Sequence, residues 1–531
     1  MRIRTSLLPL GVFLLTAVAQ LPFFDLWFSF MDEGHMLQFA DIGRKGGEFY
    51  RDATFYPLPG AFHFLGFVFD VFGPSVRVSR WIVLLEFSLF VAILFIVLRR
   101  ATGSQSWALV GVFGLWLYRI WSFPHWQMYS YSTTSLLVLL ACVWTLLIYF
   151  DRRDLRWLGI SGLLYGLGVF CKQDYGAAAG LAIAATFWLF LATESRASRP
   201  SLVVTFSTFL LPAAAIGAMT GLYYWQAGLL EDLLRFTVFN HFMGMGAYEY
   251  TEFPDLLPLL GMDPGNRTMY SVVNHLPAIV FTADWPAAHS HFLFTDTGLY
   301  DALIKLFFFG PQVLLTGSAL KLWLKRESFR SHGDPALRQR RLAEFIIFAF
   351  GCTLILLVWL NKPQDYVHLA VLYWPLIALV VVHAHDLLSG HPRRKWVAAL
   401  VLCLPALVLV AYSGRLVHRF HAAHATLVDG ERAGIYVKPE EAKMLEDVVS
   451  YIRENSEPDE AVAALPYFPM ALFLAERMGP HRSAYIVWPF PEIPDRDQAI
   501  VDAMEAKQTD VVIYNFTQFQ SFDPVWDHAP I

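Results

Sequence analysis

The sequence predicts a polytopic α-helical membrane protein with a small α/β domain at its C-terminal end. Three observations lead to this prediction. Hydrophobic residues occupy 56% of the 531 positions and charged residues only 16%, and runs of roughly 20 mostly apolar residues recur along the chain. A soluble protein of this length needs more polar residues to cover its surface, so the composition indicates a membrane environment.

Apolar stretches that can cross a bilayer recur through the first four-fifths of the chain, about eleven of them by a hydropathy window. They are Ser6–Phe24, Arg80–Leu98, Ser106–Phe123, Thr133–Phe150, Leu155–Phe170, Tyr175–Ala192, Leu202–Trp225, Tyr300–Leu322, Leu342–Leu360, Val367–Leu388 and Trp396–Ser413. The first contains Ala17-Val18-Ala19, a possible signal-peptide cleavage site. Its apolar character continues to Phe24, so we predict a retained membrane anchor.

The distribution of Lys and Arg predicts the orientation, because short cytoplasmic loops hold an excess of them. With the N-terminus inside, the inner loops carry clusters such as Arg99-Arg100 and Arg393-Arg394-Lys395, whereas the short outer loops have almost none. An odd number of spans then places the C-terminus outside, with two long loops, 25–79 and 226–299. Within the first, Pro57–Phe72 is too short for a span and predicts a helix in the membrane interface.

From Arg415 onward the apolar runs give way to alternating short patterns. These patterns predict the helices Pro439–Glu454, Met470–Met478 and Asp495–Ala506 and the strands Ala461–Leu465, Ser483–Trp488 and Asp510–Tyr514. Such alternation is typical of a small α/β domain with partly parallel strands. We therefore divide the chain into a membrane domain, residues 1–414, and an outer-face domain, residues 415–531.

Several function classes are excluded or disfavoured by composition and motifs. The formal net charge of -5 offers no basic field for nucleic acid. The four cysteines have no CxxC spacing, and no GxGxxG or GxxxxGK[ST] loop is present to bind a nucleotide. His289 and His291 lack a third ligand at a recognisable spacing. No cofactor is therefore indicated, although a divalent cation is left open.

Two adjacent carboxylates, Asp32 and Glu33, lie in the first long outer loop just past the membrane end of the first span. A carboxylate there is hydrated and still close enough to the lipid headgroups to meet a membrane-bound substrate. That position suits a general base that activates an acceptor hydroxyl. The alternative is that Asp32 or Glu33 caps a helix predicted at Gly34–Gly46, because acidic residues favour a helix N-terminus.

Two further polar segments interrupt apolar runs on the same predicted face. They are Cys171–Gly176, which contains Lys172, Gln173, Asp174 and Tyr175, and Asn361–His368, which contains Lys362, Asp365 and His368. A charge costs roughly 2.5–3.5 kcal/mol at the centre of a membrane helix, so a lysine beside the apolar phase needs a partner or access to water. We favour a substrate role for Lys172. The alternatives are pairing with Asp174 or snorkelling, and for Lys362 ordinary solvent exposure.

Two charged residues within predicted spans are weaker candidates for a role in substrate binding or catalysis. Arg119, near the outer end of its span, is a candidate phosphate ligand that snorkelling explains equally well. Glu86 lies inside a span, where an ionised carboxylate is expensive, so we expect it to be protonated or hydrogen-bonded within the bundle rather than catalytic.

The first outer loop carries a series of short motifs: Asp32-Glu33-Gly34, Tyr50-Arg51-Asp52, Tyr56-Pro57-Leu58-Pro59-Gly60, Phe72-Gly73 and Arg77–Arg80. Together with the span count and the terminal α/β domain, they resemble the GT-C glycosyltransferases, whose relatives include the protein O-mannosyltransferases and the bacterial aminoarabinose transferases of lipid A. Pro57-Leu58-Pro59 departs from the consecutive prolines of that family, and the lysine that often precedes them is absent. Arg51 is the nearest substitute.

The resemblance implies an inverting glycosyltransferase that moves a sugar from a polyprenyl-phosphate donor to a lipid, glycan or protein acceptor at the outer face of a bacterial inner membrane. In that family the acidic residue of the first loop is catalytic, which points to Asp32 with Glu33 as its neighbour. The other expected site residues bind the donor phosphate, namely Lys172, Arg51, His368 and Lys362, or the substrate, namely Tyr56, Gln173, Asp174, Tyr175 and Asp365.

Two other classes of function remain open from the sequence. A transporter or flippase of a lipid-linked saccharide also has many spans, although its charges are expected along a path through the bilayer, often with internal repeats. A non-catalytic scaffold that binds a saccharide through the C-terminal domain is the other. The clustering of polar residues at one predicted face favours the enzyme, with membrane lipids and no nucleic acid as its other partners.

Overall fold

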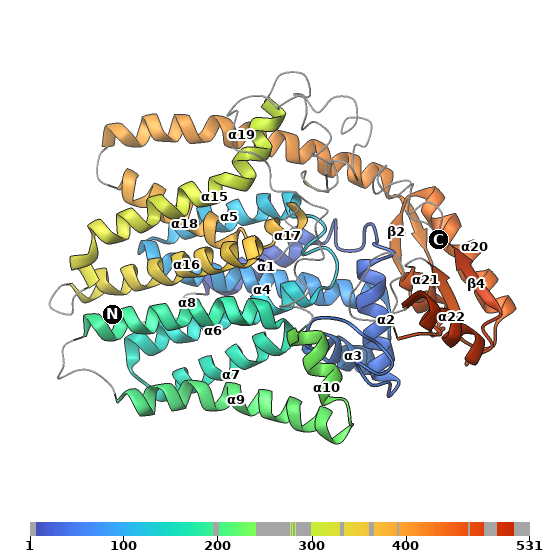
Figure 1. The fold of residues 1–531 in the computed structure, drawn as a ribbon. Helices are drawn as coiled ribbons and strands as arrows, with labels where there is room; N and C mark the ends of the chain where they lie inside the picture. Colours follow the sequence, from blue (N-terminus) through green and yellow to red (C-terminus); the bar gives the residue numbers. More distant parts are fainter. Residues whose placement is uncertain are drawn as a thin grey trace.

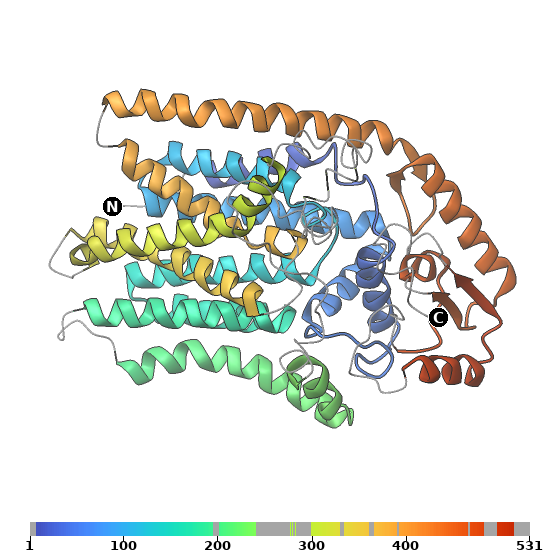
Figure 2. The same ribbon diagram turned by 45° about the horizontal axis from the view of Figure 1, so that its top comes forward.

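The structure, a computed structural model, is a bundle of long helices with a small α/β unit at one end (Figures 1 and 2). It describes residues 7–194, 201–239, 299–329, 334–360, 366–389, 392–465, 468–482 and 496–514, together with positions 277, 279 and 282. Lys362, Asp365, His289, His291 and the predicted strand Ser483–Trp488 lie outside the described residues.

Every predicted span contains a helix. The bundle helices are α1 (Leu8–Gln20), α4 (Val76–Thr102), α5 (Gln105–Trp121), α6 (Tyr131–Arg152), α7 (Leu155–Cys171), α8 (Gln173–Thr193), α9 (Leu202–Gln226), α15 (Leu299–Leu324), α16 (Pro335–Leu360), α18 (Trp374–Leu388) and α19 (Pro392–Ala423). Among the described residues, α4, α6, α8 and α9 are each long and apolar enough to cross a membrane. The total of about eleven spans stays a prediction.

The predicted span Val367–Leu388 differs from the structure, because two helices occupy it. They are α17 (Tyr366–Ala370) and α18, and a turn at Val371 and Leu372 separates them. Pro375 occupies the first turn of α18. Proline has no amide hydrogen and is favoured in the first turn of a helix, so the helix restarts there.

The surface of the bundle is apolar in the way a lipid-facing surface requires. On α9, Val203 is 78% exposed and Leu211 66%, and Trp188 of α8 is 70% exposed. Such side chains in water would form a large exposed apolar patch, which soluble monomers avoid. By contrast, the side chains of α4 and α6 are mostly buried, so these two helices form the centre of the bundle. The chain is therefore a multi-pass membrane protein.

Two helices of the segment 25–79, named the first outer loop after its predicted side of the membrane, cover the end of the bundle that faces the α/β unit. They are α2 (Asp32–Arg44) and α3 (Gly60–Phe72), and Figure 1 shows α2 running across the direction of the long helices. Helix α3 occupies the segment predicted to lie in the interface, and it exposes Phe67 by 64% and Phe72 by 70%. Exposed phenylalanines on one short helix suit a position at the membrane surface.

The α/β unit follows α19 directly. It consists of β1 (Thr426–Val428), β2 (Ile435–Val437), α20 (Pro439–Asn455), β3 (Val462–Leu465), α21 (Pro469–Ala475), α22 (Arg496–Ala506) and β4 (Val511–Tyr514). Strands β1 and β2 are antiparallel, whereas β3 and β4 pair in parallel with Val462 opposite Val511. Helix α19 runs through the predicted domain boundary at Arg415 to Ala423, so the two parts are joined by a continuous helix rather than by a loop.

The first outer loop binds the α/β unit through backbone and side-chain contacts. The Trp27 amide donates to the Tyr436 carbonyl at 2.7 Å, and Gln38 Nε2 donates to the Arg477 carbonyl at 2.9 Å. The buried Arg432 Nη1 lies 3.0 Å from Asp41 Oδ2. Burial raises the pKa of the Asp41 carboxyl. The charges and hydrogen bonds of Arg432, Arg44 and Lys45 lower it by more, so the pKa of Asp41 is below its ordinary value.

Gly34 allows the closest approach between the two parts. A Cβ atom on Gly34 would lie 2.3 Å from the Met470 backbone nitrogen at the start of α21. A backbone atom cannot move away by changing rotamer as a long side chain can. We therefore expect Gly34→Ala to push α2 and α21 apart and to lower the free energy of unfolding by about 1–3 kcal/mol. Gly11→Ala is the control, since nothing lies within 4 Å of a Cβ there.

The measurement is amide hydrogen exchange in the described segment 468–482. Gly34→Ala should raise exchange there, and Gly11→Ala should leave it at the wild-type rate. Unchanged exchange in both variants would show that the contact between α2 and α21 is not closely packed.

Candidate active site

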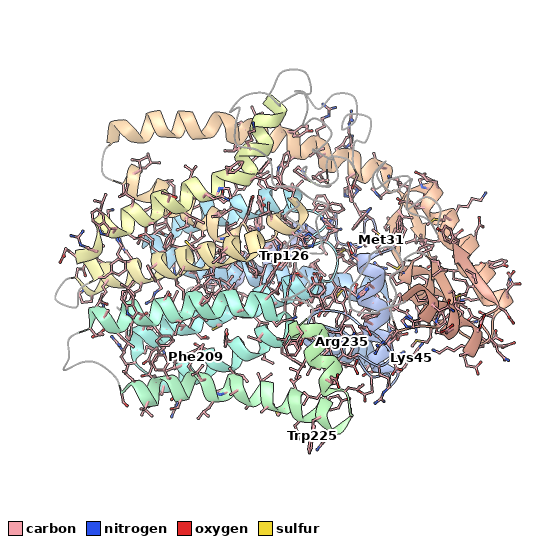
Figure 3. All side chains as sticks on the ribbon, in the orientation of Figure 1. Met31, Lys45, Trp126, Phe209, Trp225 and Arg235 are labelled. Atoms are coloured by element: carbon pink, nitrogen blue, oxygen red, sulfur yellow. The ribbon has the colours of Figure 1, made fainter. Side chains whose placement is uncertain are left out.

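Asp32 is the first residue of α2, and its side chain is exposed. Met31, labelled in Figure 3, marks this start of α2 at the end of the bundle. The Asp32 amide donates to Ser29 Oγ at 3.1 Å, which fixes the turn before the helix. The N-terminus of a helix interacts favourably with a negative charge, so this position suits a carboxylate that acts as a base. The alternative, acidic residues that stabilise a helix N-terminus, also agrees with the structure, because Asp32 and Glu33 both lie in the first turn of α2, although the N-cap residue Met31 makes no side-chain cap.

Glu33 lies in a different environment, and its assignment as a catalytic residue needs correction. Its side chain is fully buried, with Oε1 2.5 Å from Arg80 Nε and Oε2 2.6 Å from Arg80 Nη2. Arg80 also donates to the Trp27 carbonyl at 2.9 Å. Both carboxylate oxygens therefore bind one guanidinium, and neither is available to a substrate. The arrangement assigns Glu33 to anchoring the first loop on α4.

Lys172 occupies the junction between α7 and α8 and is only 4% exposed. Its Nζ donates to Ser132 Oγ at 3.1 Å and lies 3.7 Å from Asp174 Oδ2. It also lies 3.7 Å from the centre of the Tyr175 ring. Burial lowers the pKa of this lysine, but Asp174 and the neighbouring tyrosines outweigh that effect and raise it above its ordinary range. Pairing with Asp174, one of the two alternatives, is what the structure shows.

Tyr131, the first residue of α6, connects Asp32 with Lys172. The Asp32 carboxylate interacts electrostatically with the Tyr131 phenol. The Tyr131 hydroxyl lies 2.7 Å from the Tyr56 hydroxyl, and Lys172 Nζ lies 5.2 Å from the Tyr131 ring centre. The structure thus brings Tyr56, Lys172, Asp174 and Tyr175 together near Tyr131, and Asp32 lies within electrostatic range of the Tyr131 phenol.

Gln173 holds the first outer loop against the same junction. Its Nε2 donates to the Tyr56 carbonyl at 2.7 Å and to the Thr237 carbonyl at 3.0 Å, while its Oε1 accepts from the Leu58 amide at 3.0 Å. These bonds occupy both ends of the amide. Gln173 therefore positions Tyr56 rather than presenting its own side chain to a substrate.

The described contact of Arg51 lies away from this cluster. The exposed Arg51 donates from Nη2 to the Ala227 carbonyl at 2.9 Å, after the end of α9, and no contact with Asp32 or Lys172 is found among the described residues. His368 is exposed on the short helix α17. Arg51 is therefore not placed as a ligand of a phosphate held beside Lys172, and the assignment of His368 to the donor phosphate stays a prediction.

The two charged residues inside predicted spans, Glu86 and Arg119, both form hydrogen bonds with protein groups. Thr134 Oγ1 donates to Glu86 Oε1 at 2.9 Å, so the expectation of a hydrogen-bonded Glu86 is confirmed. Arg119 Nη2 donates to the Trp126 carbonyl at 2.9 Å and to Gln127 Oε1 at 3.1 Å. The Arg119 guanidinium therefore binds protein groups near the outer end of its helix.

Two residues near the site, and one buried lysine elsewhere, were not selected from the sequence. Tyr131 and Ser132 begin a span, where a tyrosine usually indicates only the aromatic belt of a membrane protein. Lys305, 6% exposed, lies in the N-terminal part of α15. Its position within a predicted span could have identified Lys305 from the sequence, because charged residues in membrane spans are rare and mostly functional. No group of three or more potential metal-ligating side chains occurs within the described part of the chain.

Comparisons with known proteins agree with this architecture. Residues 56–224 match the model of a family described as dolichyl-phosphate-mannose-protein mannosyltransferase. A search of curated proteins found no match. Among solved structures, ArnT from Cupriavidus metallidurans bound to undecaprenyl phosphate is similar with a TM-score of 0.52, at 12% identity over 98% of this chain and 91% of that chain. The apo state of ArnT gives 0.51 at 13% identity, over 97% and 90% of the two chains.

The helical bundle, the first outer loop and the terminal α/β unit together define a polytopic membrane protein of the GT-C fold. The resemblance to the GT-C glycosyltransferases that the first-loop motifs indicated is confirmed by the family match and by the two ArnT structures. At 12–13% identity the likeness to ArnT establishes the fold. The family match begins at the Tyr56 motif and ends within α9, so it includes Lys172 and Tyr131.

Proposed function

We propose that this protein is an inverting glycosyltransferase that takes a sugar from a polyprenyl-phosphate donor. The observation that carries the proposal is the group of Tyr56, Tyr131 and the buried ammonium of Lys172 at one end of a GT-C bundle, with the exposed Asp32 at the start of α2 within electrostatic range of Tyr131. The fold match to a structure bound to undecaprenyl phosphate supports the class of donor.

The proposed reaction is a single displacement. Asp32 removes the proton of an acceptor hydroxyl while the hydroxyl oxygen attacks the anomeric carbon of the sugar. The bond between that carbon and the phosphate oxygen breaks, and the phosphate departs with the electron pair. A phosphate monoester has a second pKa near ~6, so it leaves without a general acid. The positive charge of Lys172 stabilises the charge that develops on the phosphate.

We place this site at the outer face of a bacterial inner membrane. The helix ends rich in arginine and lysine lie at the end of the bundle away from α2 (Figure 1). They carry Arg99, Arg100, Arg152, Arg153, Lys325, Arg326, Arg338 and Arg341. Since cytoplasmic loops hold the excess of these residues, the α2 end is assigned to the outside. The acceptor there is a lipid, a glycan or a protein.

The test is incubation of the purified full-length protein with a panel of polyprenyl-phosphate sugars and candidate acceptors. We expect acceptor-dependent release of polyprenyl phosphate, together with inverted configuration at the anomeric carbon of the product. Movement of the intact lipid-linked saccharide across vesicles without cleavage would instead establish a transporter. Saccharide binding with neither outcome would establish a scaffold.

A further inference from the structure

A second polar site lies where the first outer loop meets the α/β unit, apart from the Tyr131 cluster. A cavity of about 550 Å³ opens there, within the range of small-molecule binding sites. Its charged and ionisable lining consists of Lys45, Arg51, Asp52, His481, Arg482 and Lys507. The first three follow α2 in the outer loop, whereas the others belong to the α/β unit. The cavity therefore exists only because the two parts are in contact.

The lining has a surplus of positive charge. Lys45 lies 3.1 Å from Asp41 and Arg482 Nη1 lies 3.6 Å from Asp232, so these two cations have acidic neighbours. Arg51 donates to the backbone carbonyl of Ala227, which carries no net charge. Within the described ranges, neither Arg51 nor Lys507 has a carboxylate partner. Arginine is suited to bidentate binding of phosphate or carboxylate groups.

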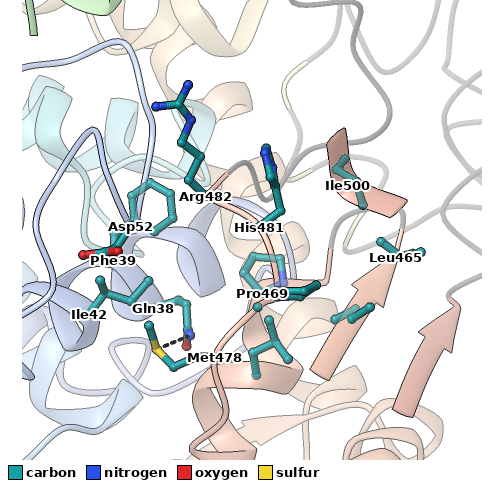
Figure 4. A pocket seen from close by; sticks show the side chains of 15 residues that line it. Gln38, Phe39, Ile42, Asp52, Leu465, Pro469, Met478, His481, Arg482 and Ile500 are labelled. Carbon is teal, nitrogen blue, oxygen red and sulfur yellow. Dashed lines mark hydrogen bonds between the residues drawn. The ribbon is translucent and has the colours of Figure 1, made fainter. Parts of the chain in front are cut away.

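The inner end of the cavity is closed by a narrower pocket that shares Ile42, Asp52 and the segment 478–482 with it. Figure 4 shows this pocket, with Arg482 and His481 extending from the α/β unit and Asp52 approaching from the first loop. Its remaining lining is mostly apolar, including Pro469 and Ile500. Because Lys45, Arg51 and Lys507 line only the larger cavity, an anionic ligand group is expected there.

The position of the cavity excludes the donor phosphate as its ligand. Lys45 directly follows α2, and Asp32 begins it. At 1.5 Å per residue, the two ends of α2 are about 20 Å apart. The donor phosphate is bonded to the carbon that is attacked, so it cannot lie that far from the base. Lys507 follows α22 of the α/β unit, so one side of the cavity is formed by a part of the chain outside the helical bundle.

We propose that this cavity binds an anionic group, a phosphate or a carboxylate, of an extended saccharide acceptor. The proposal rests on the proposed function and adds that the acceptor carries negative charge about 20 Å from the hydroxyl that is glycosylated. A monosaccharide or a small alcohol is too short to reach both places.

The first arm of the test measures binding of inorganic phosphate to the full-length protein, by calorimetry, independently of turnover. We expect the double variant R51Q/K507Q to bind phosphate about tenfold more weakly than wild type, because two charge-assisted contacts are lost. The matched control is Lys443→Gln, which removes an exposed lysine of α20 outside the cavity. Equal binding by wild type and the double variant would overturn the proposal, and no binding by wild type would do the same.

The second arm measures transfer to one glycan acceptor in phosphorylated and dephosphorylated form. The double variant should raise the KM of the phosphorylated acceptor about tenfold, with kcat and the KM of the donor unchanged and no effect on the dephosphorylated form. An effect that appears only in vesicles of anionic lipid would assign the cavity to the bilayer and reject the acceptor. Phosphate binding that depends on Arg51 and Lys507 without transfer from any polyprenyl-phosphate sugar would refute the proposed function and leave the anion site standing.

Discussion

Replacing Asp32 with Asn is expected to lower the rate of sugar transfer by about 10²–10⁴-fold, the usual contribution of a positioned general base. Asparagine keeps the size of the side chain and its place at the start of α2, but it cannot accept the proton of the acceptor hydroxyl. The measurement is kcat for release of polyprenyl phosphate from the purified protein. Because Asp32 is exposed, the free energy of unfolding should change little.

The control for this variant is Asp70→Asn. Asp70 is an exposed carboxylate on α3, in the same outer loop, with a side chain that is 59% accessible and lies 3.9 Å from Arg44. It undergoes the same chemical change away from Tyr131, so its turnover should match wild type. Full activity of Asp32→Asn, or an equal loss in Asp70→Asn, would remove Asp32 from the mechanism.

Apolar periodicity predicted the positions of the helices well, because a membrane helix needs a long apolar run wherever it lies in the fold. The break at Leu372 was missed, since both α17 and α18 are apolar and only Pro375 indicated a restart. The boundary at Arg415 was placed where the composition becomes polar. Helix α19 nevertheless continues to Ala423, because a helix can pass from lipid into water without a change of backbone.

The candidate site was predictable only in part, since its partners are distant in sequence. Lys172 and Asp174 are close neighbours, and their pairing was one of the alternatives considered from the sequence. The contact between the Tyr56 and Tyr131 hydroxyls spans 75 positions, and no local pattern indicates it. Arg51 is near Tyr56 in the chain, yet its guanidinium binds the end of α9. The distance between two residues along the chain was therefore a poor guide to whether Arg51 and Lys172 belong to the same site.

The adjacent carboxylates Asp32 and Glu33 show the same limit. Consecutive residues of a helix point in different directions, and here one carboxylate is exposed while the other is buried. What decides between them is Arg80, which lies 47 positions further along the chain. The buried pair with Arg80 favours a structural role for Glu33 and leaves Asp32 as the candidate for catalysis.

Breaking the pair between Glu33 and Arg80 should have the largest effect on stability. Both side chains are 0% exposed, so Arg80→Leu leaves a carboxylate buried without its partner. Removing one member of a buried ion pair costs about 3–5 kcal/mol, whereas replacing both by apolar residues is often much less costly. We expect Arg80→Leu to lower the free energy of unfolding in detergent by that amount, and Glu33→Leu/Arg80→Leu to recover part of the loss.

Recovery should be incomplete, because Arg80 also donates to the Trp27 carbonyl, which loses its donor in both variants. Arg453→Leu is the comparison, since that half-exposed arginine lies 3.4 Å from the exposed Glu476 and such surface pairs contribute about 0–1 kcal/mol. If Arg80→Leu were no less stable than Arg453→Leu, the pair would not anchor the loop. Asp32 adjoins Glu33, so any loosening of that anchor must also reach the proposed base and lower turnover in the Arg80 variant.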